Sequence, residues 1–170
     1  MTRAATHPPA FRPKGHDHSD CMADALQAAE RLCARRGARL TEIRRRVLEL
    51  VWCSHQPVGA YALLERLGRE RGRVAPPTVY RALDFLIAHG LVHRIASLNA
   101  YIGCAHPGRD HIGQFLVCSA CGSAAELDDR RIDRAVRSGA EAAGFAVERP
   151  VIELAGRCPN CREGGRYAAR

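Results

Sequence analysis

Two pairs of cysteines offer the clearest chemistry in this sequence. Each pair has the spacing Cys-x-x-Cys: Cys118 with Cys121 in "CSAC", and Cys158 with Cys161 in "CPNC". A two-residue gap lets both sulfurs turn toward one ion, and four thiolates around a tetrahedral centre are typical of a structural zinc site. The alternatives are two disulfides, a redox Cys-x-x-Cys or an iron–sulfur cluster. With sulfur in all four positions no place is left for water or substrate, so we predict a zinc ion that stabilises the fold and does not catalyse.

The stretch 101–113, "YIGCAHPGRDHIG", lies just before the first pair and raises the question of a second metal site. It holds four side chains that can bind a metal: Cys104, His106, Asp110 and His111. A polar loop without metal is the alternative, because single histidines and cysteines are more often packed or solvated than ligating. The spacing is not a motif, so the residues leave both interpretations open.

Charge and cysteine divide the chain in the same way. The 170 residues carry a formal net charge of +8, and residues 1–94 hold 16 Lys and Arg against 9 Asp and Glu, whereas residues 95–170 hold 10 against 9. Five of the eight cysteines lie in the second part, and the other three, Cys21, Cys33 and Cys53, are expected to be small packing residues of helices. The basic first part suits a polyanionic partner. The sequence shows no apolar run typical of a membrane span or a secretory signal, so we expect a cytoplasmic protein whose cysteines bind metal.

Periodic apolar residues predict four helices and a hairpin in the basic part. The helices are expected within 23–37, 40–53, 60–72 and 78–90, and the hairpin strands within 91–97 and 100–104. This order is that of a winged helix-turn-helix, whose last helix enters the major groove of DNA. In that helix Thr78, Tyr80 and Arg81 lie outside the apolar stripe. The "RVAPP" before it predicts an extended turn, because proline disfavours helix at itself and at the residue before it.

The second part is predicted to be a small α+β unit. Strands are expected at 114–118 and 124–128, a helix over 129–143, and a longer strand over 145–158. The zinc ion would tie the turn after the first strand to the end of this unit, which is too small to have a large core. The fold class of the whole chain is therefore α+β.

These motifs together make the sequence similar to the ferric uptake regulator superfamily, and in particular to its zinc uptake regulator branch. The resemblance is carried by "RLTEIRRRVLEL", "PPTVYRALDFLIAHGLVHRI", "NAYIGC", "CSACG" and "CPNC", and it covers roughly residues 21–162. It implies a homodimeric, zinc-responsive transcriptional repressor of zinc uptake genes that binds double-stranded operator DNA and no small-molecule substrate. The implied domains are a disordered or loosely packed tail (1–20), a winged-helix DNA-binding domain (21–97), a hinge (98–104), a dimerisation and metal-binding domain (105–162) and a C-terminal tail (163–170).

The resemblance also implies a regulatory zinc ion at the hinge, bound by His93 from the DNA-binding domain and by Cys104, His111 and Glu126 from the other side of the hinge. Two nitrogens, one sulfur and one carboxylate can complete a zinc tetrahedron, which with the four-cysteine site gives two zinc ions per protomer. The sequence departs from iron-type members, which carry a dense histidine-aspartate cluster where this chain has "HPGRDH". Peroxide sensors use oxygen-rich coordination, whereas the thiolate of Cys104 favours zinc.

The DNA contacts implied by the resemblance are Arg81, which would read a purine edge, and Tyr61, which would touch base or backbone. Arginine can donate a bidentate pair to guanine O6 and N7. Thr78, Tyr80 and the arginines at 44–46 suit phosphate contacts. For the arginines, a solvated helix face is the alternative.

Three other functions could use the same residues. The chain could be an iron-, manganese- or peroxide-responsive member of the superfamily, or a zinc-ribbon module for protein interaction, although that module leaves the basic winged helix unexplained. An enzyme could use Cys104 as nucleophile with a nearby histidine as base. No loop that would stabilise an oxyanion is recognisable, so we expect no enzymatic activity.

Overall fold

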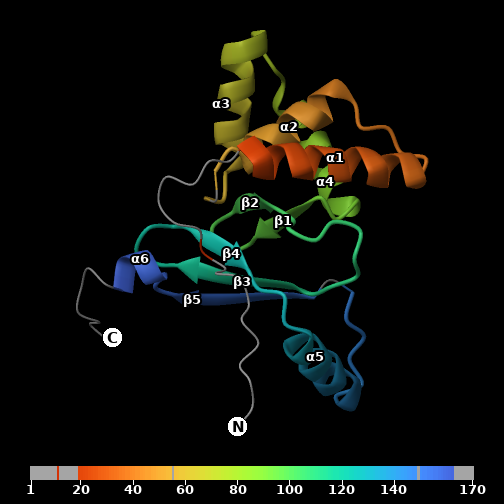
Figure 1. The fold of residues 1–170 in the computed structure, drawn as a ribbon, viewed down its shortest axis with the longest axis vertical. Helices are drawn as coiled ribbons and strands as arrows, with labels where there is room; N and C mark the ends of the chain where they lie inside the picture. The colour runs from red at the N-terminus through yellow and green to blue at the C-terminus, as the bar shows by residue number, and fades with distance from the viewer. Residues whose placement is uncertain (1–10, 12–18, 55, 149, 163–170) are drawn as a thin grey trace.

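The computed structural model of this chain describes residues 11, 19–54, 56–148 and 150–162. Figure 1 shows three levels: a group of helices, a hairpin beneath it, and a sheet beneath the hairpin. The hairpin has two strands and the sheet has three. The first two levels are formed by α1 Ser19–Arg35, α2 Glu42–Trp52, α3 Ala60–Arg71, α4 Pro76–Ala88, β1 Val92–Ile95 and β2 Ala100–Gly103. Helices followed at once by a hairpin form the element order expected for a winged helix.

The core of the helical unit is made by the apolar stripes of its helices. In α4 the buried residues are Val79, Ala82, Leu83 and Leu86, which confirms the helical periodicity of that segment. The expected start of this helix was wrong. Ala75 is extended, as the residue before a proline should be, but the two prolines after it form the first turn of α4. Proline is tolerated there because the first N–H groups of a helix have no intrahelical partner.

The hairpin is attached to the helical unit on two sides. Val58, in the segment before α3, exchanges two backbone hydrogen bonds of 2.9 Å with Tyr101 of β2. The indole of Trp52, at the end of α2, packs on Gly103, where a Cβ atom would lie 2.2 Å from the ring. Glycine is therefore required at this close approach. These contacts join the hairpin to the helical unit.

The third level is a sheet of strand order β4-β3-β5, with β3 antiparallel to β4 and parallel to β5. Its elements are β3 Gly113–Cys118, β4 Ala124–Glu126, α5 Arg130–Ala142, β5 Val151–Gly156 and α6 Pro159–Arg162. The chain crosses from β4 to β5 through α5, which lies on the far side of the sheet from α1–α4 (Figure 1). The last strand is shorter than the expected 145–158. It begins after Pro150, which has no N–H for the ladder.

The hairpin and the sheet share a small apolar core. Ile95 and Ile102 of the hairpin pack with Phe115, Val117 and Ala124 of the sheet, and all of them are buried. These residues fix the hairpin over one face of the sheet, so the segment that joins the two levels lies beside a packed interface.

The two ends of the chain, residues 1–20 and 163–170, were expected to be tails. Helix α1 begins at Ser19, inside the range expected for the N-terminal tail. The rest of the tail, with His7, His16 and His18, and the segment 163–170 lie outside the described residues. Among the described residues, no helix is both long and apolar enough to cross a lipid bilayer.

Candidate metal centres and DNA-binding surface

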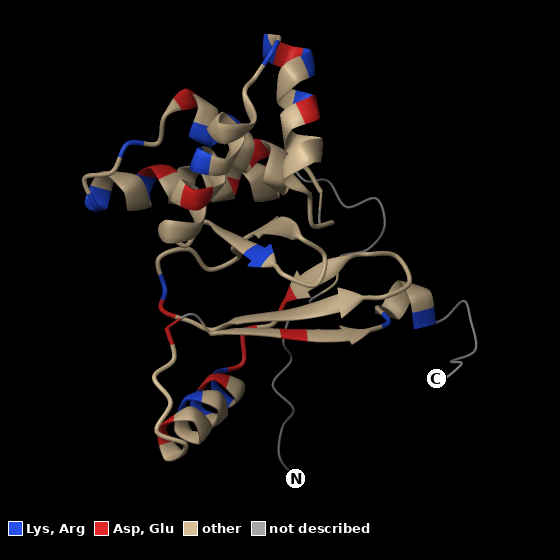
Figure 2. Ribbon diagram, turned by 180° about the vertical axis from the view of Figure 1, so that it is seen from behind, with Lys and Arg blue, Asp and Glu red and all other residues tan. Residues whose placement is uncertain are grey.

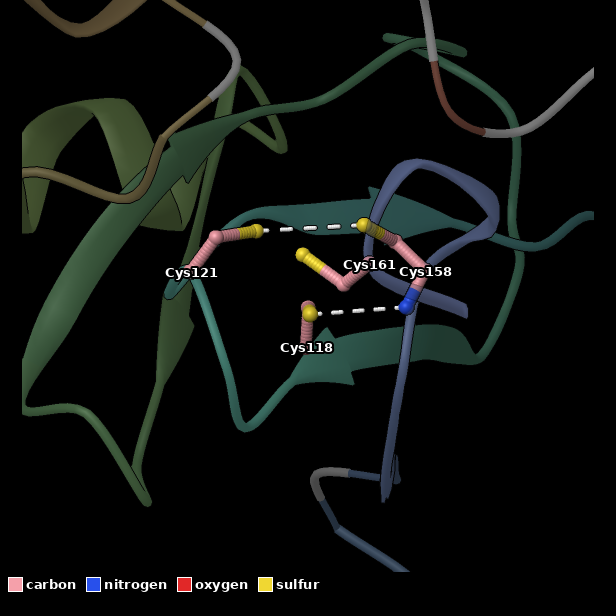
Figure 3. Close-up of side chains that lie close together, drawn as sticks. All are labelled: Cys118, Cys121, Cys158 and Cys161. Atoms are coloured by element: carbon pink, nitrogen blue, oxygen red, sulfur yellow. Dashed lines mark hydrogen bonds between the residues drawn. The ribbon is translucent and has the colours of Figure 1, made fainter. Parts of the chain in front are cut away.

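The four cysteines of the two Cys-x-x-Cys pairs come together at one end of the sheet. Cys118 is the last residue of β3, Cys121 lies in the turn that follows, Cys158 follows β5, and Cys161 lies in α6. Figure 3 shows their sulfurs pointing toward one another, and all four lie within 4.8 Å of each other. The sulfurs of Cys121 and Cys158 are 3.8 Å apart. Zn–S bonds of about 2.3 Å place tetrahedral sulfurs about 3.8 Å apart, so the arrangement fits zinc.

The backbone around this cluster stabilises a thiolate at Cys118. The Cys158 N–H lies 3.4 Å from Cys118 Sγ (Figure 3). Burial acts to raise the pKa of Cys118, but N–H groups of Cys158, Cys121 and Ala120 outweigh it and bring the pKa to about 6. A thiolate is the form that binds metal. Ser123 was not anticipated from the sequence, yet its hydroxyl lies 3.1 Å from Cys121 Sγ.

A second set of ligands lies at the junction of the hairpin and the sheet. His93 of β1, Cys104 just after β2, His111 just before β3 and Glu126 at the end of β4 offer ligand atoms that all lie within 4.8 Å of one another. His111 Nε2 is 3.7 Å from Cys104 Sγ and 2.8 Å from one oxygen of Glu126. The structure therefore brings together all four residues that the resemblance implied.

This set is divided equally between the two levels of the molecule. The Cys104 N–H donates to the Leu91 carbonyl at 3.0 Å, so Cys104 belongs to the hairpin with His93. His111 and Glu126 belong to the sheet. We expected only His93 to come from the DNA-binding half, and the hairpin hydrogen bond corrects this. An ion held by the four residues would join the hairpin to the sheet with two ligands on each side.

The surroundings of the two histidines are compatible with metal binding at Nε2. His111 Nδ1 lies 2.9 Å from the Arg109 carbonyl, an acceptor that holds a proton on Nδ1, so Nε2 is the ring atom that could bind an ion in place of its own proton. The Nε2 atom of His93 is buried, 3.3 Å from Glu126 Oε1, and forms no directed hydrogen bond with a described residue. A buried nitrogen without such a bond is costly unless something binds it, so this observation fits a metal ligand.

The charges of the set are mutually dependent. Cys104 and Glu126 raise the pKa of His111 to about 11. Burial acts to lower the pKa of His93, but contacts with Cys104 and Glu126 outweigh it and raise that pKa to about 9. Burial acts to raise the pKa of Glu126, and the two histidines hold it well below its usual range. A divalent ion would replace the histidine protons and neutralise the thiolate and carboxylate.

The two other candidate ligands of the loop have different partners. His106 Nε2 lies 3.5 Å from an Asp128 oxygen, and Asp110, whose side chain is 95% exposed, lies 3.7 Å from Arg137. Neither belongs to the second ligand set. This distribution supports the choice of His111 as the ligand of the loop.

The residues implied for DNA contact lie at the exposed beginnings of α3 and α4. Tyr61 is 78% exposed and Tyr80 is 42% exposed, which is unusual for large aromatic side chains. Arg81 is exposed, and no carboxylate among the described residues pairs with it. Thr78 is half-buried in the first turn of α4. The surface offers two aromatic rings and a free guanidinium.

The arginines at 44–46 are less available than the sequence suggested. Arg44 lies over the ring of Phe85 at 3.6 Å, a cation–π contact. Arg45 and Arg46 form ion pairs with acidic residues of α1, α2 and α3. Figure 2 shows the same mixture, with acidic positions interleaved among the basic ones over the helical unit. These arginines link helices to one another.

Three further cysteines were expected to be helix-packing residues. Cys33 is buried in the core, as expected. Cys53 is exposed, and its sulfur lies 3.0 Å from the Leu50 carbonyl and 2.8 Å from the Arg66 guanidinium, so the packing role was wrong for this residue.

Comparison with known proteins places this geometry in a family. The model of the ferric uptake regulator family matches residues 35–155. The zinc uptake regulation protein of Escherichia coli (strain K12) is 37% identical over 141 residues, which cover 82% of this chain and 82% of that protein. The zinc uptake regulation protein of Mycobacterium tuberculosis is 30% identical over 129 residues, covering 74% of this chain and 96% of that protein.

Solved structures agree with these relatives. A zinc uptake regulator complexed with zinc and DNA matches with a TM-score of 0.79 and 36% identity, covering 84% of this chain and 95% of that chain. The holo form of XcZur matches with a TM-score of 0.76 and 44% identity, covering 83% of this chain and 99% of that chain. The apo form of XcZur has the same 44% identity but a TM-score of 0.50. On its sequence and its fold, this chain belongs to the ferric uptake regulator family, in the zinc uptake regulator branch.

Proposed function

We propose that this chain is a zinc-responsive transcriptional repressor that binds operator DNA as a zinc-loaded homodimer in the cytoplasm and controls genes of zinc uptake. The observation that carries the proposal is the second ligand set, in which a thiolate, two imidazoles and a carboxylate meet at the joint between the hairpin and the sheet. Sulfur and nitrogen ligands in a tetrahedron select zinc over the harder Fe(II) and Mn(II). The alternative of an iron- or manganese-responsive member therefore has less support.

The two metal centres have different roles. The four-cysteine centre joins the ends of β3 and β5 and would be occupied whenever the sheet is folded. The centre at His93, Cys104, His111 and Glu126 would respond to the zinc supply. Each protomer would then hold two zinc ions.

The regulatory ion would act on the angle between the helical unit and the sheet. With two ligands from the hairpin and two from the sheet, bound zinc fixes how the helical unit is oriented on the sheet. In a homodimer this orientation sets the spacing of the two recognition helices relative to successive major grooves. Without zinc the DNA-binding geometry is one of several, and the apparent affinity for DNA falls by the fraction of molecules that adopt it. Zinc and DNA must then each tighten the binding of the other.

The two XcZur structures support this view. Both are 44% identical to this chain, so their different TM-scores, 0.76 for holo and 0.50 for apo, reflect conformation and not sequence distance. The arrangement described here resembles the holo form. It also resembles the regulator complexed with zinc and DNA.

The homodimer would form through the far side of the sheet. Helix α5 has no buried residue, and the apolar side chains of Val136, Phe145 and Leu154 are between 37% and 67% exposed on this side of the chain. Exposed apolar groups in such number are typical of an interface. A second copy of the chain would cover them and leave the helical units at the two outer ends.

The DNA would meet the beginnings of α3 and α4. Arg81 would donate to a guanine edge, and Tyr61 would contact a base or the backbone. Thr78 and Tyr80 would hold phosphates and so fix the register of the recognition helix. The family is one of transcriptional regulators, which agrees with a function in binding and not in catalysis.

A binding titration tests the proposal. The purified dimer is analysed for metal, and its affinity for operator duplexes is then measured by fluorescence anisotropy at buffered free zinc, Fe(II) and Mn(II). We expect binding that requires zinc, with the other ions acting only at much higher concentration. Equal activation by Fe(II) would exclude the zinc assignment, and failure to bind any duplex would favour a protein-interaction module.

The variant Arg81→Ala tests the DNA surface. We expect a loss of about 1–3 kcal/mol in operator affinity, with reduced discrimination between operators at one base position. Arg157→Ala, which removes an exposed guanidinium after β5, away from α3 and α4, is the control. An unchanged operator affinity for Arg81→Ala would remove this residue from the interface.

A further inference from the structure

A second carboxylate of the sheet reaches the hairpin, at a place where no metal ligand lies. Glu153 of β5 accepts the Ala96 N–H at 2.6 Å with one oxygen and the Ser97 N–H at 3.1 Å with the other. Both donors lie in the turn between β1 and β2, which is the tip of the wing. The contact spans 57 positions of sequence and joins the wing of the DNA-binding unit to the C-terminal sheet.

The strand register explains why this carboxylate reaches the wing. Phe115 of β3 is the partner of Glu126 in β4 and of Glu153 in β5, so the three residues form one row across the sheet. Cross-strand partners lie on the same face, and the Phe115 ring is packed under the hairpin. Both carboxylates therefore face the hairpin from opposite edges of the sheet.

The two carboxylates hold the hairpin in the same chemical way. Glu126 accepts the Ala105 N–H at 2.8 Å, just beyond the end of β2, while its other oxygen faces the histidines of the second ligand set. Glu153 accepts two N–H groups at the opposite end of the hairpin. Hydrogen bonds to a charged acceptor are stronger than those between neutral groups. Burial acts to raise the pKa of Glu153, and its bonds to Ser97 and Ala96 hold that pKa below its usual range.

We propose that Glu153 is a metal-independent anchor that positions the wing of the DNA-binding unit on the C-terminal sheet. The zinc ligands hold the hairpin at the β4 edge, the core around Phe115 supports it in the middle, and Glu153 holds it at the β5 edge. Zinc alone would leave the unit free to tilt about the β4 edge. The anchor removes that tilt, so that the zinc site selects one orientation of the recognition helix. The role in DNA binding rests on the proposed function, whereas the anchor itself does not.

Amide hydrogen exchange in the zinc-loaded dimer tests the anchor directly. Exchange at Ala96 and Ser97 is measured by NMR in the wild type, in Glu153→Ala and in Glu153→Gln. We expect exchange at these two amides to be faster by about tenfold or more in Glu153→Ala, with a smaller increase in Glu153→Gln, whose amide oxygen still accepts one bond. Glu148→Gln, which removes a negative charge from an exposed position before β5, is the control and should leave both amides unchanged.

Operator affinity at saturating zinc tests the positioning role. We expect both Glu153 variants to bind the operator several-fold more weakly than the Glu148→Gln control, with the same zinc content per protomer and the same dimeric state. Unchanged exchange at Ala96 and Ser97 would overturn the anchor. Faster exchange with unchanged operator affinity would overturn the positioning role. If the wild type bound no operator, the proposed function would fail while the exchange measurement still decided the anchor.

Discussion

Replacing Cys104 by serine should move the zinc concentration at which DNA binding begins, and the size of that shift can be worked out from the site. The thiol is 2% exposed and its sulfur lies 3.7 Å from His111 Nε2, so it is placed to act as one of four ligands. Serine has a shorter, harder donor that must lose a proton with a much higher pKa. We therefore treat the substitution as the loss of one ligand of four.

The expected magnitude follows from the energy of zinc binding. Four-ligand zinc sites in small domains bind with about 10–16 kcal/mol, which is about 3 kcal/mol per ligand. This corresponds to about two orders of magnitude in zinc affinity. Because zinc and DNA binding are linked, the free zinc concentration at half-maximal DNA binding should rise by the same factor. The operator affinity at saturating zinc should be largely retained, since the other three ligands still join hairpin to sheet.

The assay is a zinc-buffered titration with two signals. Anisotropy of a labelled operator reports DNA binding, and emission from the single tryptophan, Trp52, reports the site, because its indole packs on Gly103 next to Cys104. The matched control is Cys33→Ser, a cysteine with the same 2% exposure in the helical core. A shift below about threefold, or an equal shift in the control, would refute the sensory role of Cys104.

Three further predictions concern the two centres and the hairpin. Cys118→Ser should remove one zinc ion per protomer and unfold the sheet, so that size-exclusion chromatography shows loss of the dimer; a dimer with unchanged metal content would contradict the structural role. Gly103→Ala places a Cβ atom 2.2 Å from the indole ring and should destabilise the chain by about 1–3 kcal/mol in thermal unfolding, whereas Gly156→Ala, with open space around it, should not. In protein freed of the regulatory zinc, the raised pKa values of His93 and His111 contribute stability that is complete below about pH 6.5 and is lost as the pH rises through about 9 and about 11. Urea unfolding between pH 6 and 10 should show this decline, and a flat profile would exclude protonated histidines in the metal-free site.

Much of the fold could be predicted from residue patterns because its signals are local. The apolar stripe of α4 and the two Cys-x-x-Cys spacings need no knowledge of the rest of the chain. The second ligand set is different, since His93 and Glu126 are 33 positions apart and no spacing rule joins them. Only the resemblance to a family suggested that set. The equal division of ligands between hairpin and sheet depends on the Cys104 hydrogen bond to Leu91, which no sequence pattern indicates.

Tertiary contacts decided the features that were not anticipated. The arginines at 44–46 form a basic run in the sequence, but acidic residues of neighbouring helices pair with two of them once the helices pack. The role of Glu153 depends on strand register, because a shift by one residue would turn its side chain to the other face of the sheet. Both features depend on contacts between elements that are distant in sequence. Composition carries no information about these contacts.

The four-cysteine centre also has a consequence for the order of folding. Cys118 and Cys158 are 40 positions apart, and closing a loop of that length costs about 3 kcal/mol of chain entropy before the parallel pairing of β3 with β5 can repay it. The helical unit has short-range contacts and precedes the sheet in the chain, so it should fold first during synthesis. The sheet, and with it the apolar face proposed for dimerisation, would fold only when an ion joins both cysteine pairs. A cell short of zinc would therefore accumulate half-assembled chains, and the supply of zinc would limit the number of functional molecules on a slower timescale than it controls their activity.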